Sequence, residues 1–320
     1  MTDFKRLTKE ECANLLLSAK SPTVLMHVRP DGDTVGTAIA LIRTFEALGK
    51  EATYLCKDKI PERLRFILGD ARQNEAPTGD IITVDVASPS QAGGLLDRLK
   101  APLFAIDHHA VNTPFAPNYT VEGASSAAEA LMDVLEVLEK RGLLKITSYI
   151  AEPLYTAISS DTGCFCFSNT TEKTHMRAAR LLSFGIDAAT INRLLFSSKS
   201  EGQIKAEGLV ASKLKSLQDG KIRYVTVSRR EREALGIPFE EFETAIDVVR
   251  SVKGTVIAIA VKETDEGAFK ASLRSTSPNV AEIAAQFGGG GHALAAGCTI
   301  SGESIEGAIA ALLQKLTNIK

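Results

Sequence analysis

The stretch TVLMHVRPDGDTVGTAIALIRTFEALG, residues 23–49, decides the fold of the first half of the chain. Residues 23–27 are a short apolar run that leads into a polar segment, which predicts a strand followed by a loop. Residues 34–48 then place apolar side chains at helical spacing, and Gly49 stands where a helix C-cap is expected. The order strand, loop, helix is the unit from which parallel α/β sheets are built.

Two further segments repeat this order. Residues 80–87 predict a strand with a helix at 91–99, and residues 103–107 predict a strand with a later helix at 125–141. Alternating strands and helices predict a doubly wound, mostly parallel sheet. Ligands of such sheets bind beyond the carboxyl ends of the strands, so polar residues at those ends are the first functional candidates.

The rest of the chain has a different pattern. The helices predicted next are residues 148–160, residues 172–184 and two more, without a strand, within residues 186–217. After Gly220 the predicted strands are residues 221–228, 255–262 and 268–273, and the predicted helices are residues 231–235, 239–252, 280–287 and 303–316. This mixture predicts a smaller α+β domain. The expected organisation is a first domain at residues 1–190, a helical connector at 191–219 and a second domain at 220–320.

Composition limits the class of protein. The 320 residues carry 37 Lys and Arg against 39 Asp and Glu, and a net charge of −2 gives no global basic field for long nucleic acid. No apolar run reaches the roughly 18 residues of a membrane span, and the charged N-terminal segment does not resemble a signal peptide. A cytoplasmic protein is therefore expected. The five scattered cysteines fit reduced thiols rather than a disulfide framework.

Acidic residues and histidines gather at the predicted strand ends. In chain order they are His27, Asp31, Asp33, Asp85, Asp107, His108, His109 and Asp161. The first three flank one loop, where they could face one point. An isolated D-x-D is more often a turn or a helix N-cap, but several such sites in one predicted crevice favour a metal-binding centre.

The charges of these residues favour two cations. The carboxylates of Asp31, Asp33, Asp85 and Asp161 would force one another to protonate unless cations compensated them. Mixed carboxylate and imidazole ligands suit Mn²⁺, which is our first choice, with Mg²⁺ or Co²⁺ as alternatives. Two metal ions form a clamp for displacement at phosphorus, so the sequence predicts phosphoester hydrolysis.

These segments resemble the DHH phosphoesterase superfamily, which is named for a triplet that stands here as Asp107-His108-His109. The resemblance covers nearly the whole chain, and the segment that begins Asp161-Thr162-Gly163 is most similar to the bacterial nanoRNase and pAp phosphatase group. It implies a DHH catalytic domain, a DHHA1 substrate-binding domain, an active site in the cleft between them and, in many relatives, a homodimer.

The same resemblance implies a role for each site residue. The implied ligands of one metal are His27, Asp31 and Asp85, and those of the other are Asp33, Asp85, His108 and Asp161. His109 would stabilise charge on the scissile phosphate or assist the leaving group, and Asp107 would orient a histidine.

A glycine-rich segment near the C-terminus, Gly288-Gly289-Gly290-Gly291-His292, resembles part of the DHHA1 substrate domain. Glycines let backbone N–H groups come close to an anion, although a helix C-cap with a hinge also fits this pattern. Upstream, Arg274 adds a cation and Ser275 adds a hydroxyl group. The expected substrate-binding set is Arg274, Ser275, Gly289, Gly290, Gly291 and His292.

The expected function is manganese-dependent hydrolysis of short single-stranded oligoribonucleotides to mononucleotides, and of 3′-phosphoadenosine 5′-phosphate (pAp) to AMP. Hydrolysis of cyclic di-AMP or of linear pApA is an alternative that differs only in the shape of the pocket, and a pyrophosphatase or polyphosphatase is another. A nucleotide- or RNA-binding regulator without chemistry is less favoured, because no ligand is missing. A Rossmann dehydrogenase is disfavoured because no G-x-G-x-x-G follows the first strand. Neither membranes nor long duplexes are expected partners.

Overall fold

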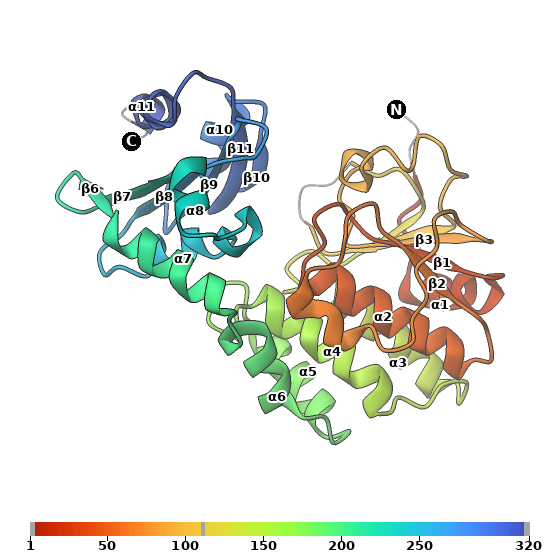
Figure 1. Ribbon diagram of the computed structural model, residues 1–320. Coiled ribbons are helices and arrows are strands. Elements are labelled where there is room, and N and C mark those ends of the chain that lie inside the picture. The colour runs from red at the N-terminus through yellow and green to blue at the C-terminus, as the bar shows by residue number, and fades with distance from the viewer. Residues whose placement is uncertain (1–3, 110–112, 317–320) are drawn as a thin grey trace. The chain divides into compact units, whose positions relative to one another are not determined.

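The computed structural model describes residues 4–109 and 113–316, and internal contacts divide the chain into two units, Met1–Ser198 and Lys199–Lys320 (Figure 1). The division falls inside the segment 191–219, which the sequence predicts as a connector. Every helix in the described ranges is too short or too polar to traverse a lipid bilayer. All five cysteines are free thiols.

The first unit is built on a five-stranded parallel sheet. Its strands run in the order β2 (Thr53–Leu55), β1 (Thr23–Leu25), β3 (Ile81–Val84), β4 (Phe104–Asp107) and β5 (Asn118–Thr120). All four pairs of neighbours are parallel. Parallel sheets are covered on both faces, and every residue of β1, β3 and β4 is buried. The predicted α/β class is confirmed.

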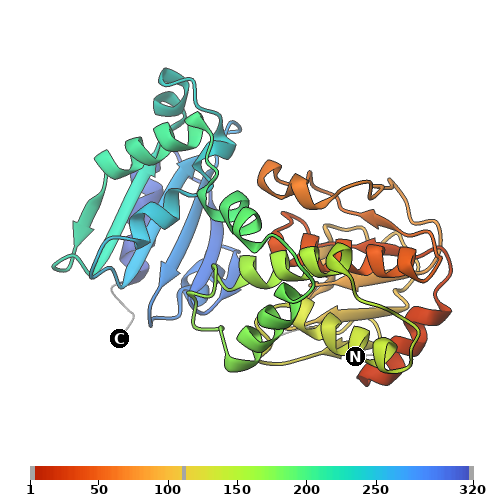
Figure 2. The same cartoon turned by 90° about the horizontal axis from the view of Figure 1, so that it is seen from below.

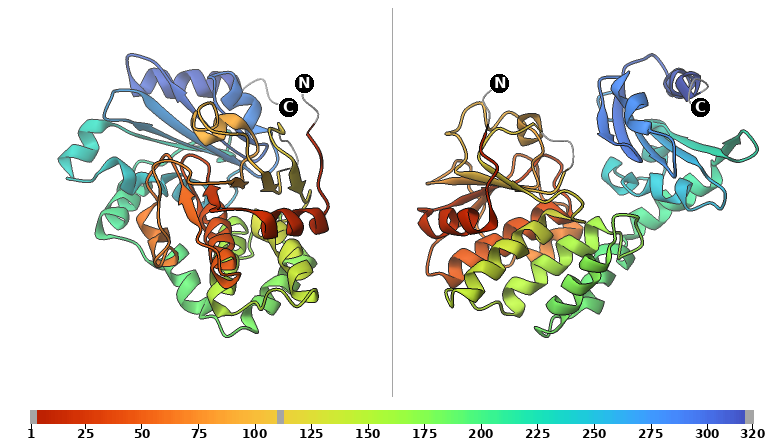
Figure 3. Two further views of the ribbon diagram at one scale, coloured as in Figure 1. Left: turned by 90° about the vertical axis from the view of Figure 1, so that its right-hand side faces the viewer. Right: turned by 180° about the vertical axis from the view of Figure 1, so that it is seen from behind.

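Helices cover one face of this sheet (Figures 1 and 3). The helices of the unit are α1 (Lys9–Ser18), α2 (Gly32–Ala47), α3 (Ala127–Lys140), α4 (Ser148–Asp161), α5 (Glu172–Leu182) and α6 (Ala188–Asn192), with a 3₁₀ segment η1 (Glu62–Ile67). Their apolar side chains share one core with the sheet. A smaller apolar cluster joins Leu25 and Leu55 of the sheet to Ala92, in the 3₁₀ turn η2 (Pro89–Ala92).

Two local features let α2 and α4 pack closely. Pro153 lies inside α4 and has no N–H for the carbonyl of Tyr149, which instead accepts a hydrogen bond of 2.6 Å from Nη1 of Arg43 on α2. Gly36 gives room at the contact, because a Cβ there would lie 2.6 Å from the carbonyl oxygen of Pro153 and 2.8 Å from the Cβ of Ala157.

The helix predicted at residues 91–99 is wrong. This segment holds only the turn η2 and further turns. Gly93 and Gly94 have φ of +63° and +80°, in the left-handed region, which a right-handed helix cannot include. The apolar residues that suggested a helix include Leu95 and Leu96. They belong to this irregular segment and pack against apolar side chains of the sheet.

The prediction of helices without a strand at residues 186–217 is also wrong. The segment contains α6, a π-helical turn η3 (Arg193–Ser197), α7 (Glu201–Ser212) and a strand, β6 (Lys215–Leu217). β6 pairs antiparallel with β7 (Ile222–Val227). Gln218, Asp219 and Gly220 all have positive φ, so they form the tight turn between the two strands, and Asp219-Gly220 is a hairpin signal that the sequence contained.

The second unit is built on a six-stranded mixed sheet. Its order is β10 (Gly290–His292), β11 (Ala295–Ile300), β9 (Phe269–Ser275), β8 (Ile257–Glu263), β7 and β6. Among the described strands of this second sheet, only β7 and β8 pair in parallel. The predicted α+β class of this part is confirmed.

Each face of the second sheet carries its own core. One contains side chains of α10 (Val280–Ala285) and α11 (Ile305–Leu316), and the other contains those of α7 and α9 (Ala245–Arg250). Figure 2 shows the backbone of α7, in green, next to this sheet. A short helix α8 (Arg229–Ala234) follows β7. The single helix predicted at 239–252 is wrong, because the 3₁₀ turn η4 (Phe239–Phe242) precedes α9 and the Phe242 carbonyl at the break accepts a hydrogen bond from Nζ of Lys262.

The close contact at Gly36 makes a stability prediction. Gly36→Ala should lower the free energy of unfolding by about 1–3 kcal/mol, because the added methyl group meets backbone atoms of α4 that cannot move aside. Gly208→Ala in α7 is the matched control, since its Cβ would meet no atom within 4 Å; it should raise stability by roughly 0.5–1 kcal/mol. Calorimetric unfolding of both variants checks this, and equal stability of the Gly36 variant and the parent would contradict it.

Candidate metal centre and phosphoesterase site

The carboxyl ends of three neighbouring strands bring the predicted site residues together. His27 follows β1, Asp85 follows β3 directly, and Asp107 ends β4, with His108 and His109 next in the chain. Because β1, β3 and β4 are adjacent and parallel, their carboxyl ends share one edge of the sheet. The site therefore lies where the sequence predicts it.

His27, Asp31 and Asp85 form one potential metal-binding group, in which one ligand atom of each residue lies within 4.8 Å of the others. Nε2 of His27 lies 3.3 Å from Oδ2 of Asp85 and 3.6 Å from Oδ1 of Asp31. Nδ1 of His27 lies 2.9 Å from the carbonyl oxygen of Val28, so Nε2 is the nitrogen that faces the carboxylates. The carboxylate of Asp31 also caps α2, accepting backbone N–H groups of its first turn.

Asp33, His108 and Asp161 form a second group of the same kind. Nε2 of His108 lies 3.6 Å from Oδ2 of Asp33 and 3.8 Å from Oδ2 of Asp161. Its Nδ1 lies 3.2 Å from the carbonyl oxygen of Ala124. The same Nε2 is 3.5 Å from Oδ1 of Asp85, which joins the second group to the first.

The start of α3 holds the carboxylate of Asp33. The backbone N–H groups of Ala127 and Ala128 donate to it over 2.6 Å and 3.3 Å, and the hydroxyl of Thr37 donates over 3.0 Å. A helix N-terminus stabilises negative charge through its aligned peptide dipoles. Asp33 is only 1% exposed, so these donors replace the water that its carboxylate loses.

A glycine brings the end of α4 against the start of α2. A Cβ at Gly32 would lie 2.1 Å from Oγ of Ser160, so the two segments touch at this point. Asp161 is the next residue and the last of α4. The close approach therefore places the end of α4, with Asp161, beside Asp31 and Asp33 at the start of α2.

His109 lies beside both groups. Its Nδ1 lies 2.8 Å from Oδ1 of Asp107 and 3.5 Å from Oδ1 of Asp85. The ring centroids of His108 and His109 are 4.6 Å apart. Asp85, His108 and His109 also satisfy the distance criterion for a metal-binding group. The orienting role of Asp107 stays a prediction.

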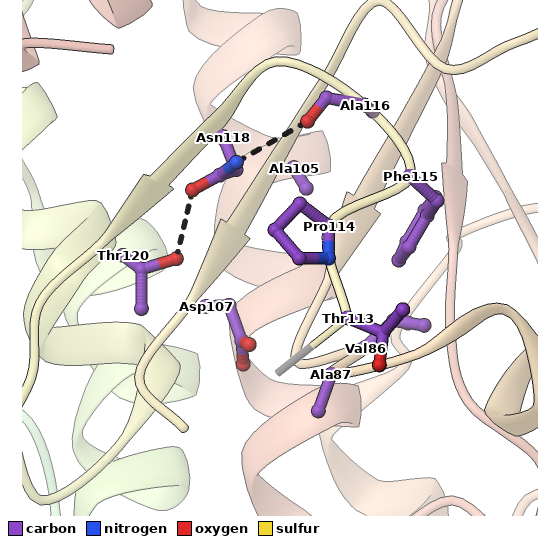
Figure 4. Close-up of a pocket in the computed structure, with 10 residues that line it drawn as sticks. All are labelled: Val86, Ala87, Ala105, Asp107, Thr113, Pro114, Phe115, Ala116, Asn118 and Thr120. Atoms are coloured by element: carbon purple, nitrogen blue, oxygen red, sulfur yellow. Dashed lines mark hydrogen bonds between the residues drawn. The ribbon is translucent and has the colours of Figure 1, made fainter. Parts of the chain in front are cut away.

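A small cavity lies on the β5 side of Asp107 (Figure 4). Pro114, Phe115 and Asn118 are among its lining residues, and its volume is about 10 Å³. This is at the lower limit for one water molecule. The cavity is therefore a gap in the packing behind the site and is too small to hold a nucleotide.

Asp85 shows the features expected of a ligand that links two groups. It is 3% exposed, and among the described residues its Oδ1 has no hydrogen-bond partner. Its φ is +57°, a left-handed conformation that costs free energy in a residue other than glycine and that occurs at functional sites. A buried carboxylate oxygen without a donor, among carboxylates and imidazoles, fits a divalent cation.

The histidines and Asp85 shift one another's pKa values strongly. Burial by itself lowers the pKa of His27, but the carboxylates of Asp31 and Asp85 outweigh it and raise the pKa to about 11. Burial also lowers the pKa of His108, and its neighbouring aspartates raise it to about 11. Burial raises the pKa of Asp85, but the two histidines outweigh this and hold it well below its usual range.

Two other aspartates have pKa values above their usual range. Burial, together with the charge of Asp85, raises the pKa of Asp33 well above its usual value. Burial also raises the pKa of Asp161, and the charges of Asp31 and Asp85 contribute, so that it reaches about 7. Protons thus offset the crowded negative charge in the metal-free protein, and bound cations would replace them.

One geometric expectation is wrong. His27, Asp31 and Asp33 do not face a single point, because Asp33 lies inside the first turn of α2 and its carboxylate accepts the N–H groups of α3. The structure does bring all eight predicted residues of the site into one neighbourhood. Their division between two metal ions stays a prediction.

Sequence reasoning missed the groups that hold the ligands. The carbonyl of Ala124 and the N–H groups of Ala127 and Ala128 are backbone atoms, which no residue type reveals. Asn169 donates hydrogen bonds of 3.1 Å to the carbonyls of Ser125 and Asp161. The only available signal was Ser125-Ser126 before an apolar helix, which is typical of a helix start.

The predicted substrate-binding residues lie together in the second unit. Arg274 and Ser275 end β9, and β11 lies between β9 and β10. Ser275 donates its backbone N–H to the carbonyl of Leu294, in the turn between β10 and β11. The backbone of His292 is in β10, whereas its side chain lies outside the described part of the chain.

The glycine-rich segment has two parts. Gly290 and Gly291 are in β10, which pairs antiparallel with β11. Gly288, with φ of +71°, and Gly289 close the end of α10 as a helix C-cap, because their N–H groups donate to the carbonyls of Ala285 and Ala284. A Cβ at Gly289 would lie 2.2 Å from the carbonyl oxygen of Gly297, and one at Gly291, whose φ is +140°, would lie 2.5 Å from that of Ala295. The glycines are therefore needed for close approach of the two backbones.

Comparison with known proteins assigns both units. The DHH family, N-terminal domain, matches residues 22–158, and the DHHA1 domain matches residues 219–318. The bifunctional oligoribonuclease and PAP phosphatase NrnA of Thermus thermophilus is 31% identical over 94% of this chain and 91% of its own length. The protein of the same name from Bacillus subtilis is 26% identical over 86% of this chain and 87% of its own length.

A solved structure shows the same fold. The exopolyphosphatase-related protein of Bacteroides fragilis superposes with a TM-score of 0.87 over 97% of this chain and 95% of that one, at 22% identity. With both domains matched in order and a relative above 30% identity over nearly its full length, the chain belongs to the DHH/DHHA1 phosphoesterase family, whose members hydrolyse phosphoester bonds.

Proposed function

We propose that this chain is a Mn²⁺-dependent phosphodiesterase and phosphatase that hydrolyses short oligoribonucleotides to mononucleotides and pAp to AMP. The observation that carries the proposal is the convergence of the strand-end aspartates and histidines into linked metal-binding groups. The names of the relatives from Thermus thermophilus and Bacillus subtilis, oligoribonuclease and PAP phosphatase, support the choice of substrates.

The proposed ligands follow the geometric groups. Those of one metal are His27, Asp31 and Asp85, and those of the other are Asp33, Asp85, His108 and Asp161. When bound, a pair of divalent cations would activate water for attack and neutralise the charge that develops on the phosphoryl group. The carboxylates and imidazoles would hold the two cations at fixed positions, so that the site need not reorganise as charge develops on the phosphoryl group.

His109 is proposed to act on the scissile phosphate. Asp107 accepts a hydrogen bond from its Nδ1 and, with Asp85, outweighs burial so that the pKa of His109 is raised. A protonated imidazole can stabilise charge on the phosphoryl oxygens or give a proton to the leaving oxygen. Asp107 therefore acts by fixing the ring and its charge.

The second unit is proposed to hold the nucleotide. Its contribution is a guanidinium, a hydroxyl group and the backbone of a glycine-rich strand, which together suit a phosphate group. The proposed residues are Arg274, Ser275, Gly289, Gly290, Gly291 and His292.

A second candidate substrate is cyclic di-AMP or its linear product pApA. The cyclic-di-AMP phosphodiesterase GdpP of Bacillus subtilis is 25% identical over 95% of this chain, which spans 48% of that protein. The chemistry at the metal centre would be the same, so only the nucleotide site can separate the two candidates.

A substrate panel tests the proposal. With Mn²⁺, the protein should release AMP from pApA and inorganic phosphate from pAp, and a chelator should abolish both activities. Cyclic di-AMP and a pentanucleotide are assayed at the same concentration, and the kcat/KM values of all four substrates rank the alternatives. Absence of turnover of pApA and pAp, with metal shown to be bound, would contradict the proposal.

The link between the two groups predicts different losses for two variants. Asp85→Asn should remove most bound Mn²⁺ and nearly all activity, because Asp85 approaches both groups. His109→Ala should keep the metal while lowering kcat by about 10²–10⁴-fold, the usual contribution of an acid or base. Elemental analysis and kinetics check both variants. Equal metal content in the two variants would count against the assignment.

Metal binding should depend on pH in a defined direction. Because the pKa values of His27 and His108 are raised to about 11 and that of Asp161 to about 7, the metal-free site holds protons at neutral pH. Mn²⁺ must displace them, so its apparent affinity should rise between pH 6 and 8, roughly the range around the aspartate pKa. Titration calorimetry in buffers of different ionisation enthalpy should show proton release on binding; uptake would contradict this account.

A further inference from the structure

Residues 124–128, which lead into α3, touch two members of the second ligand group. The carbonyl of Ala124 lies 3.2 Å from Nδ1 of His108, and the N–H groups of Ala127 and Ala128 donate to Asp33. We call residues 124–128 the α3 entry segment. Its position sets where one imidazole and one carboxylate of that group stand.

The third member, Asp161, is tied to the α3 entry segment by one side chain. Nδ2 of Asn169 donates 3.1 Å hydrogen bonds to the carbonyl of Ser125 and to the carbonyl of Asp161. Asp161 is the last residue of α4, and carbonyls in the last turn of a helix have no partner within that helix. The amide of Asn169 thus spans the entry of one helix and the end of another.

Residues of α3 and α5 hold the α3 entry segment in place. The hydroxyl of Ser125 donates a 2.8 Å hydrogen bond to Oε1 of the buried Glu129. Arg177 of α5 donates to the carbonyl of Glu129 and pairs with Asp133. The segment is therefore fixed to α3, and Asn169 is the side chain that transmits its position to α4.

Buried polar atoms without partners concentrate around this bridge. Within the described ranges, Oγ of Ser126, Oδ1 of Asn169 and Oγ1 of Thr170 have no hydrogen-bond partner. Such atoms are uncommon in folded proteins and mark places where water, an ion or a ligand completes the structure. These atoms lie in or directly beside the bridge, so the surroundings of Asn169 are polar and buried.

We infer that Asn169 is a positioning residue that holds Asp161 in register with Asp33 and His108, and so shapes one of the two proposed metal positions and not the other. The inference rests on the proposed two-metal function. No hydrogen bond found among the described residues joins Asn169 to His27, Asp31 or Asp85, so the other position should not depend on it.

Manganese binding to three variants of the full chain tests this inference. Asn169→Ala removes both hydrogen bonds, and Asn169→Ser leaves a small donor in case the first variant does not fold. Asn192→Ala is the matched control, because its amide also spans two partners at α4, donating to Tyr155 and accepting from Ser159, away from the α3 entry segment. Thermal unfolding of each variant shows that it is folded.

Titration calorimetry and Mn²⁺ electron paramagnetic resonance should find two sites in the parent and in the control. In a folded Asn169 variant one site should keep its parental affinity and the other should weaken by about 10- to 100-fold, the usual effect of losing a group that orients a ligand. With pAp, kcat should fall while KM stays constant, and added Mn²⁺ should restore activity.

The outcomes separate this inference from the proposed function. Two unchanged sites in a folded Asn169 variant overturn the positioning role, and equal weakening of both sites shows a general structural role and also overturns it. Fewer than two sites in the parent itself would instead remove the two-metal proposal on which the inference rests.

Discussion

Crowded negative charge is the constraint on which the first unit depends. Asp33 and Asp85 are almost fully buried, and Asp31 and Asp161 lie in the same groups. Buried like charges a few ångströms apart cannot all remain ionised without compensation. The protein supplies part of it with imidazoles and with the first N–H groups of α3, and protons or bound cations supply the remainder. The clustered carboxylates therefore favour the binding of divalent cations.

Short strands and irregular loops deliver these charges to one place. β1, β3 and β4 have three or four residues each; β1 and β3 end shortly before a site residue, and β4 ends on Asp107. Arg29 and Asp85, in the loops that follow, have φ of +55° and +57°, so the chain turns sharply as it leaves the sheet. The backbone strain is local and lies where the metal-binding groups need it.

The sequence predicted the residues that gather at the site better than the groups that position them. A carboxylate or imidazole after an apolar run is visible as a residue type, so His27, Asp85 and His108 could be placed at one sheet edge. The two backbone donors to Asp33 lie 94 and 95 positions away in the chain, and only the tertiary fold reveals them. The helix expected at residues 91–99 failed because apolar spacing outweighed two adjacent glycines, and β6 was missed because its three residues are exposed and carry no burial pattern.

The hydrogen bond from Ala127 to Asp33 joins residues that are 94 positions apart. Contacts of such sequence separation form late, because a long loop must close before they are gained. α3 thus receives an anion at its N-terminus from a residue of α2 that is distant in the chain. The second ligand group therefore exists only once the chain from α2 to α4 has folded, because Asp33, His108 and Asp161 come from three separate segments.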